Sequence, residues 1–183
     1  FTSRIVSNEL EGQTFKLQES NGRTLTQIFY SKLILSTVFF LILAILGTVA
    51  TNVFAMVNGV SVPLMITILQ ILGQLLSSFS LICFYLTFAM FTDKQGLLLS
   101  SGFLGGFIGL ILASKSTIFW TFAIPWVGCA YLSPYKFTLI NNSNYLYKFD
   151  QSIYFRFLIY LIYCLLLYLL VRSIFLKKER QRK

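Results

Sequence analysis

The stretch "LILSTVFFLILAILGTVATNVFAM", residues 33–56, decides the class of fold because it carries no charged side chain from end to end. A helix needs about 20 mostly apolar residues to cross about 30 Å of hydrocarbon, and this stretch meets that length. Three further apolar runs meet or approach it. We therefore predict an all-α integral membrane protein whose transmembrane domain, residues 33–176, has four transmembrane helices, over about 33–56, 62–91, 96–113 and 153–176.

Composition also favours a membrane location. Hydrophobic residues make up 56% of the 183 residues and charged residues only 11%, whereas soluble domains carry about 25% charged residues. Fifteen Lys and Arg against six Asp and Glu give a net charge of +9. These charges gather at the ends of the apolar runs and form no basic stripe interleaved with exposed aromatic residues. This distribution predicts the lipid bilayer, not nucleic acid, as a partner.

The chain lacks the residue patterns that most enzymes and metal sites use. It contains no His, the commonest metal ligand and general base. Cys83, Cys129 and Cys164 lie far apart in apolar runs, which favours small hydrophobic side chains over a metal cluster or a disulfide framework. The P-loop pattern G-x-x-x-x-G-K-[ST] does not occur. We expect no catalytic, metal or cofactor-binding residue and no enzyme activity by this chain itself.

Charge at the two ends predicts the topology. The opening segment, residues 1–32, contains Arg4, Lys16, Arg23 and Lys32, and the tail, residues 177–183, contains five basic residues. The positive-inside tendency therefore places both in the cytoplasm. An even number of crossings, four rather than five, connects two ends on one side. Arg156 and Arg172, near the ends of the last run, are interpreted as anchors whose charged heads reach the lipid headgroups.

Residues 117–132 are apolar but too short to cross, and Pro125 and Gly128 interrupt them. They must therefore enter and leave on one face of the membrane. Two arrangements remain open: a re-entrant hairpin bent near Pro125, or an interfacial external segment anchored by Trp120 and Trp126. Residues 133–152 are expected to follow as an external loop.

Two patterns inside the runs indicate helix packing or a substrate path. Polar side chains recur at helical spacing on one face of the second run, where they would either hydrogen-bond to other helices or line a path; they are Gln70, Gln74, Ser77 and Ser78. The third run contains two overlapping G-x-x-x-G patterns, typical of close helix packing, formed by Gly102, Gly105, Gly106 and Gly109.

The opening segment carries a resemblance to a known family. The motifs are "EGQTF" at residues 11–15, "SNGR" at 20–23 and "SKL" at 31–33. Together they resemble the cytoplasmic loop of the ABC-2 type transporter permeases, in which a short coupling helix docks on the ATPase subunit. The family pattern departs here at Gln13, between the Gly and the Thr, and at Gly22, where Pro is frequent.

The resemblance implies a fold and a set of docking residues. The four runs would be the last four of six spans, with a re-entrant or external hairpin between the fifth and sixth, and two earlier spans would precede Phe1. A coupling helix within residues 1–32 would dock on the ATPase; the alternative is an interfacial amphipathic helix without a partner. The docking residues would be Glu9, Leu10, Glu11, Phe15, Leu17 and Arg23.

The same resemblance implies a function. The chain would be the permease subunit of an ATP-driven exporter of amphipathic or antimicrobial peptides, similar to lantibiotic-immunity transporters of the plasma membrane of Gram-positive bacteria. ABC ATPase subunits, which bind ATP and Mg, and a second permease copy or a related permease would be its partners, and a peptide or lipid-like molecule its substrate. The alternative is a non-transport membrane scaffold or sensor subunit that binds a cytoplasmic partner.

Overall fold

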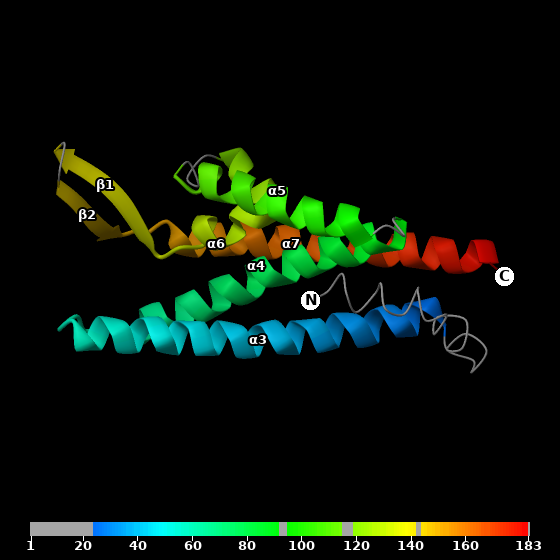
Figure 1. Ribbon diagram of the computed structural model, residues 1–183, viewed down its shortest axis with the longest axis horizontal. Coiled ribbons are helices and arrows are strands. Elements are labelled where there is room, and N and C mark those ends of the chain that lie inside the picture. The colour runs from blue at the N-terminus through cyan, green and yellow to red at the C-terminus, as the bar shows by residue number, and fades with distance from the viewer. Residues whose placement is uncertain (1–23, 92–94, 115–118, 142–143, 183) are drawn as a thin grey trace.

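The computed structural model describes residues 24–91, 95–114, 119–141 and 144–182. Four long helices dominate this part of the chain: α3 (Leu25–Val57), α4 (Leu64–Phe91), α5 (Gln95–Ala113) and α7 (Ile153–Arg182) (Figure 1). Within these ranges, all four are long and apolar enough to cross a membrane. The prediction of four helices that are long and apolar enough to span a membrane is therefore confirmed. Helices α3 and α7 are longer than predicted, since α3 begins at Leu25 and α7 continues to Arg182.

Local sequence explains where α3 begins and ends. Thr24 and Gln27 form a capping box, in which each side chain bonds to the other's backbone N–H at 3.2 Å. At the other end, Gly59 has φ of 75°, a conformation that glycine adopts at little cost. Gly59 and Val60 donate backbone hydrogen bonds to Met56 and Ala55, which is a Schellman motif. The helix therefore ends just before the short turn into α4.

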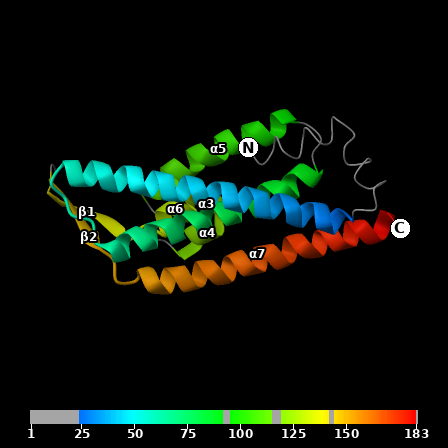
Figure 2. The ribbon, with the colours of Figure 1, turned by 90° about the horizontal axis from the view of Figure 1, so that it is seen from below.

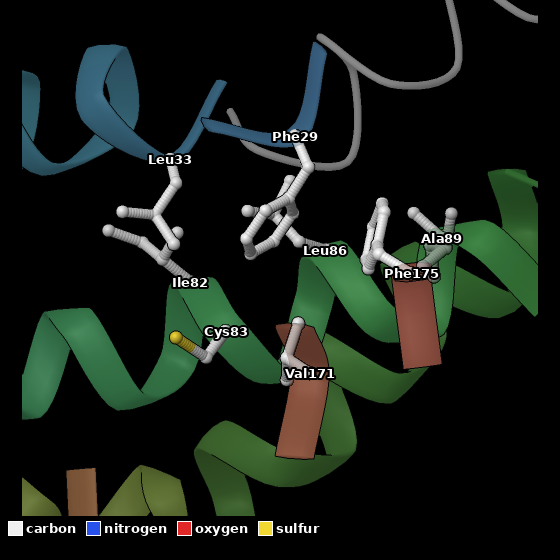
Figure 3. Packing of buried hydrophobic residues seen from close by; sticks show 9 residues of the cluster. Phe29, Leu33, Ile82, Cys83, Leu86, Ala89, Val171 and Phe175 are labelled. Carbon is white, nitrogen blue, oxygen red and sulfur yellow. The ribbon is translucent and has the colours of Figure 1, made fainter. Parts of the chain in front are cut away.

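The helices are arranged around α4, which packs against both α3 and α7. Helix α5 lies on the opposite side of the bundle from α3 (Figure 1). The start of α3 and the end of α7 lie side by side, and the two helices diverge toward their other ends (Figures 1 and 2). A buried cluster joins α3, α4, α5 and α7 near the close end (Figure 3); it consists of Phe29, Leu33, Ile82, Cys83, Leu86, Ala89, Leu98, Val171 and Phe175.

The segment between α5 and the hairpin is broken and packed into the bundle. It comprises η1 (Phe119–Ala123), η2 (Pro125–Val127) and α6 (Gly128–Tyr131), and we call residues 119–131 the inserted segment. Pro125 follows Ile124, which has an extended backbone, and a proline disfavours helix at the residue before it. The segment packs against α4 and α5, and Gly128 lies against Ser77, midway along α4. The re-entrant and the interfacial arrangement both stay predictions.

A β-hairpin occupies the region that the sequence analysis treated as a loop, which corrects an entirely α-helical prediction. Strands β1 (Tyr135–Asn141) and β2 (Asn144–Phe149) pair antiparallel, with Tyr135 opposite Phe149. Aromatic and β-branched residues favour strands. Both halves of this region contain aromatic residues, and the first half also contains Thr138 and Ile140, on either side of an Asn- and Ser-rich turn sequence. That pattern is a hairpin signal.

Candidate functional site

The six residues expected to dock on an ATPase lie outside the described residues. Glu9, Leu10, Glu11, Phe15, Leu17 and Arg23 all fall within residues 1–23. Their docking role therefore stays a prediction. The described chain begins directly after them, at the cap of α3.

The four polar side chains predicted to share one face of α4 differ in how far they are buried. Ser77 is buried, whereas Gln70, Gln74 and Ser78 are partly exposed. The Oε1 atom of Gln70 is buried and has no hydrogen-bond partner in the described part of the chain. The roles of these four side chains as helix contacts or as a substrate path therefore stay predictions.

A hydrogen-bonded cluster that the sequence analysis did not predict lies beside Ser77. Ser80 Oγ donates to the Ser77 carbonyl at 2.8 Å and lies 2.8 Å from the Tyr160 hydroxyl. Because a serine has one hydroxyl proton, Tyr160 must donate to Ser80. A Cβ atom at Gly128 would lie 2.6 Å from Ser77 Oγ. Only a glycine therefore lets the inserted segment approach α4 this closely.

Two of the four predicted packing glycines face the inserted segment. A Cβ atom at Gly105 would overlap the indole ring of Trp126, and one at Gly109 would lie 2.9 Å from the Trp126 carbonyl oxygen. On its other side, the indole packs edge-on against Phe84 and Tyr85 of α4, at centroid distances of 5.0 and 6.2 Å. Trp126 thus fills the space between α4 and α5 that these glycines leave.

The other two glycines have different surroundings. A Cβ atom at Gly102 would lie 3.0 Å from the Tyr85 hydroxyl oxygen, whereas Gly106 faces nothing within 4 Å. The glycines of the two overlapping G-x-x-x-G patterns therefore do not have equivalent neighbours. The pair at Gly105 and Gly109 receives an indole ring from the inserted segment, not another long helix.

Arg156 is not the lipid anchor that its position in the last run predicted. Its exposed fraction is 7%, and it forms an ion pair with Asp150. Its Nη1 also donates to the Tyr131 carbonyl at 2.9 Å, and Nε and Nη2 donate to Ser152 Oγ at 3.3 and 3.2 Å. Burying a guanidinium is costly unless a carboxylate and hydrogen bonds compensate, and here they do.

This Arg156 cluster joins three elements: the end of the hairpin, the end of α6 and the start of α7. Ser152 also donates to the Asp150 carboxylate, at 2.8 Å. The Arg156 guanidinium lies 5.7 Å from the centre of the Tyr131 ring. Burial raises the pKa of the Tyr131 phenol, and the Arg156 cation opposes that shift. The sequence could have indicated the contact between Ser152 and Arg156, since the two residues are one helical turn apart. It could not indicate that Arg156 also binds the carbonyl of Tyr131, which is distant in the sequence.

An apolar groove of about 320 Å³ lies between α3 and α7, with α4 as its floor. Ligand pockets commonly have volumes of about 300–1,000 Å³, so this one is at the small end of that range. None of the four polar residues predicted as a substrate path lines it. The groove is lined by Thr37, Leu75, Leu76, Phe79, Leu161, Cys164, Leu165 and Tyr168.

No family model, no curated protein and no solved structure matches the chain. Across the described ranges, there is also no group of three His, Cys, Asp or Glu side chains that could hold a metal ion. Function must therefore be inferred from how the helices, the inserted segment and the groove are arranged.

Proposed function

We propose that this chain is the membrane-spanning permease subunit of an ATP-driven ABC exporter, which moves amphipathic peptides out of the cell or out of the membrane. The observation that carries the proposal is the inserted segment between the third and fourth spans, with Pro125, Val127 and Gly128 buried. The family that the opening motifs resemble has a re-entrant or external hairpin at this place in the chain. Broken backbone at membrane depth is tolerated where protein covers it.

Contacts between the start of α3 and the end of α7 support a route by which movement of the ATPase could reach the transmembrane helices. Thr26 donates a hydrogen bond to Glu179, and the rings of Phe29 and Phe175 lie 4.3 Å apart between centroids. A movement of the docking segment, which directly precedes Thr24, would therefore reach α3 and α7 together. In the proposal, ATP and Mg bind to separate ATPase subunits, and this chain only converts their closure into a change of helix packing.

The outer surface of α5 supports the proposal of further membrane partners. Leu99, Phe103 and Leu110 are 66–75% exposed, as expected of side chains that face lipid or another transmembrane chain. In the proposal, a second copy of this chain or a related permease completes the transport path. In the same proposal, the chain lies in the plasma membrane of a Gram-positive bacterium, and both of its ends face the cytoplasm.

The experiment that tests the proposal is recovery of the full chain from its native host in mild detergent, with mass spectrometry of associated proteins and an ATP-hydrolysis assay. We expect a stoichiometric P-loop ATPase whose hydrolysis rises when an amphipathic cationic peptide is added. The double variant F15D/L17D should reduce ATPase recovery by at least about tenfold, since two apolar docking side chains each contribute about 1–2 kcal/mol.

The matched control is T14D/Q18D, which adds the same charge to the same segment without removing an apolar side chain. It should retain most of the ATPase. If the chain is recovered with a stoichiometric non-ATPase partner, or if both double variants retain the ATPase equally, the coupling assignment is wrong. Recovery with a non-ATPase partner would make the chain the non-transport scaffold or sensor subunit that the sequence also allows. Equal retention of the ATPase by both double variants would instead place the ATPase contact outside Phe15 and Leu17.

A further inference from the structure

The groove between α3 and α7 has a polar end. On α7, the lining residues Leu161, Leu165 and Tyr168 are followed by Arg172 at the same helical spacing, so all four lie on one face. The Tyr168 hydroxyl donates to the Tyr30 hydroxyl of α3 at 3.1 Å. This pair joins α7 to α3 at the lining residue Tyr168. Figure 2 shows that the two helices converge toward the end of α7.

Two groups at that end can bind an anion. Arg172 is exposed, and because Cα–Cβ bonds in a helix tilt toward its N-terminus, its side chain leans toward Tyr168 and the groove. Tyr30 accepts the hydrogen bond from Tyr168, so its own hydroxyl proton can be donated to a ligand. The polar end therefore offers a guanidinium and a phenol.

The body of the groove offers no polar partner. The Thr37 hydroxyl donates to the Leu33 carbonyl at 2.7 Å, and the Cys164 thiol contacts the Leu76 carbonyl at 3.5 Å. The remaining lining residues along the groove, short of the tyrosine pair, are Leu and Phe. A peptide backbone placed here would leave its N–H and C=O groups without partners, which is costly in a dry apolar site. A hydrocarbon chain has no such groups.

The dimensions match one leaflet of a bilayer. Leu161 and Arg172 are eleven residues apart in α7, a distance of about 16 Å along a helix. Half of a hydrocarbon core is about 15 Å thick. A lipid with its headgroup at Arg172 would therefore place its chain along the groove to the level of Leu161.

From these observations, we propose that the groove is a binding site for one anionic membrane phospholipid, with an acyl chain between α3 and α7 and the phosphate at Arg172 and Tyr30. This inference does not rest on the proposed transport function. If it is correct, a lipid is a bound component of the subunit. The lipid composition of the bilayer would then influence how α3 and α7 pack against each other.

Native mass spectrometry of the full chain in detergent tests the proposal, with phosphatidylglycerol and phosphatidylcholine of identical acyl chains as the probes. The unsubstituted chain should retain one phosphatidylglycerol in preference to phosphatidylcholine. The variant Arg172→Gln should weaken phosphatidylglycerol binding by about fivefold, since one cation near an anionic lipid surface contributes about 1 kcal/mol. It should weaken phosphatidylcholine binding less, because the choline cation offsets the charge of the phosphate. Lys177→Gln, on another face of α7, is its control.

A second variant tests the groove itself. Leu165→Trp should fill the groove and reduce retention of both lipids, whereas Leu166→Trp places the same indole on the neighbouring, 56% exposed position outside it and should change neither. Circular dichroism checks that each variant is folded. Equal retention of both lipids by the unsubstituted chain and all four variants would overturn the proposal. So would displacement of a bound amphipathic peptide, but not of lipid, by Leu165→Trp.

Discussion

The buried Arg156 guanidinium and the partly buried Asp150 carboxylate form an ion pair where the hairpin, α6 and α7 meet. Removing one partner leaves the other charge buried and unpaired, which costs about 3–5 kcal/mol in such sites. We expect Asp150→Asn and Arg156→Gln each to lower the free energy of unfolding by about 3 kcal/mol, and the double variant to lose little more. A double-mutant cycle from denaturant titrations in detergent micelles measures this. Strictly additive losses would show that the two residues act independently.

Truncation of Trp126 should release α5 from the bundle. The indole fills the space between Gly105, Gly109 and α4, so Trp126→Ala should cost about 3–5 kcal/mol. Trp120→Ala is the matched control, because that side chain is 76% exposed and its loss should cost clearly less than that of Trp126. Thermal unfolding in detergent, followed by circular dichroism, compares the two. Similar losses in both variants would contradict the packing described for Trp126.

Neighbouring glycines of α5 should respond differently to the same substitution. Gly105→Ala places a methyl group where the Trp126 ring lies, and overpacking of this kind costs about 1–3 kcal/mol. Gly106→Ala meets nothing within 4 Å and should be neutral within about 0.5 kcal/mol. The measurement is again the free energy of unfolding in detergent. The reverse order of the two losses would mean that the opposite face of α5 is the packed one.

Cysteine labelling can establish the orientation. In a background without Cys83, Cys129 and Cys164, we expect Asn58→Cys to react with a membrane-impermeant maleimide in intact cells. Lys177→Cys should react only after permeabilisation, because the basic end is expected in the cytoplasm. Both side chains are exposed at opposite ends of the bundle. Reaction of Lys177→Cys in intact cells would reverse the orientation.

Apolar run length was sufficient to predict the spans, because crossing hydrocarbon imposes a minimum length that the sequence shows directly. It did not predict the residues at which the helices begin and end. Helix α3 begins at the capping box of Thr24, about two turns before the predicted start, and charged residues continue α7 beyond its apolar part. The hairpin had a readable pattern of aromatic residues around a turn, yet its polar residues also suit an external loop.

The features of the candidate site that were not predicted from the sequence depend on contacts with residues distant in the chain. The glycine spacing in α5 indicated close approach, but whether a helix or the Trp126 ring would approach depends on how the inserted segment folds back. Likewise, an arginine near the end of a span has the same local sequence whether it reaches lipid headgroups or a buried carboxylate. The groove combines side chains from three helices, so no single periodic pattern could reveal it.

The pairing of α3 and α7 at one end has a mechanical consequence. Helix α3 has 33 residues, which makes it a rod about 50 Å long. Tyr30 and Tyr168, Phe29 and Phe175, and Thr26 and Glu179 hold the two rods together near one tip. A change of about 6° in the angle between them would displace the far tip of a rod of this length by about 5 Å. If α3 and α7 were to move apart about these contacts, a small change of angle at the joined ends would open a gap at the far ends about as wide as a hydrocarbon chain.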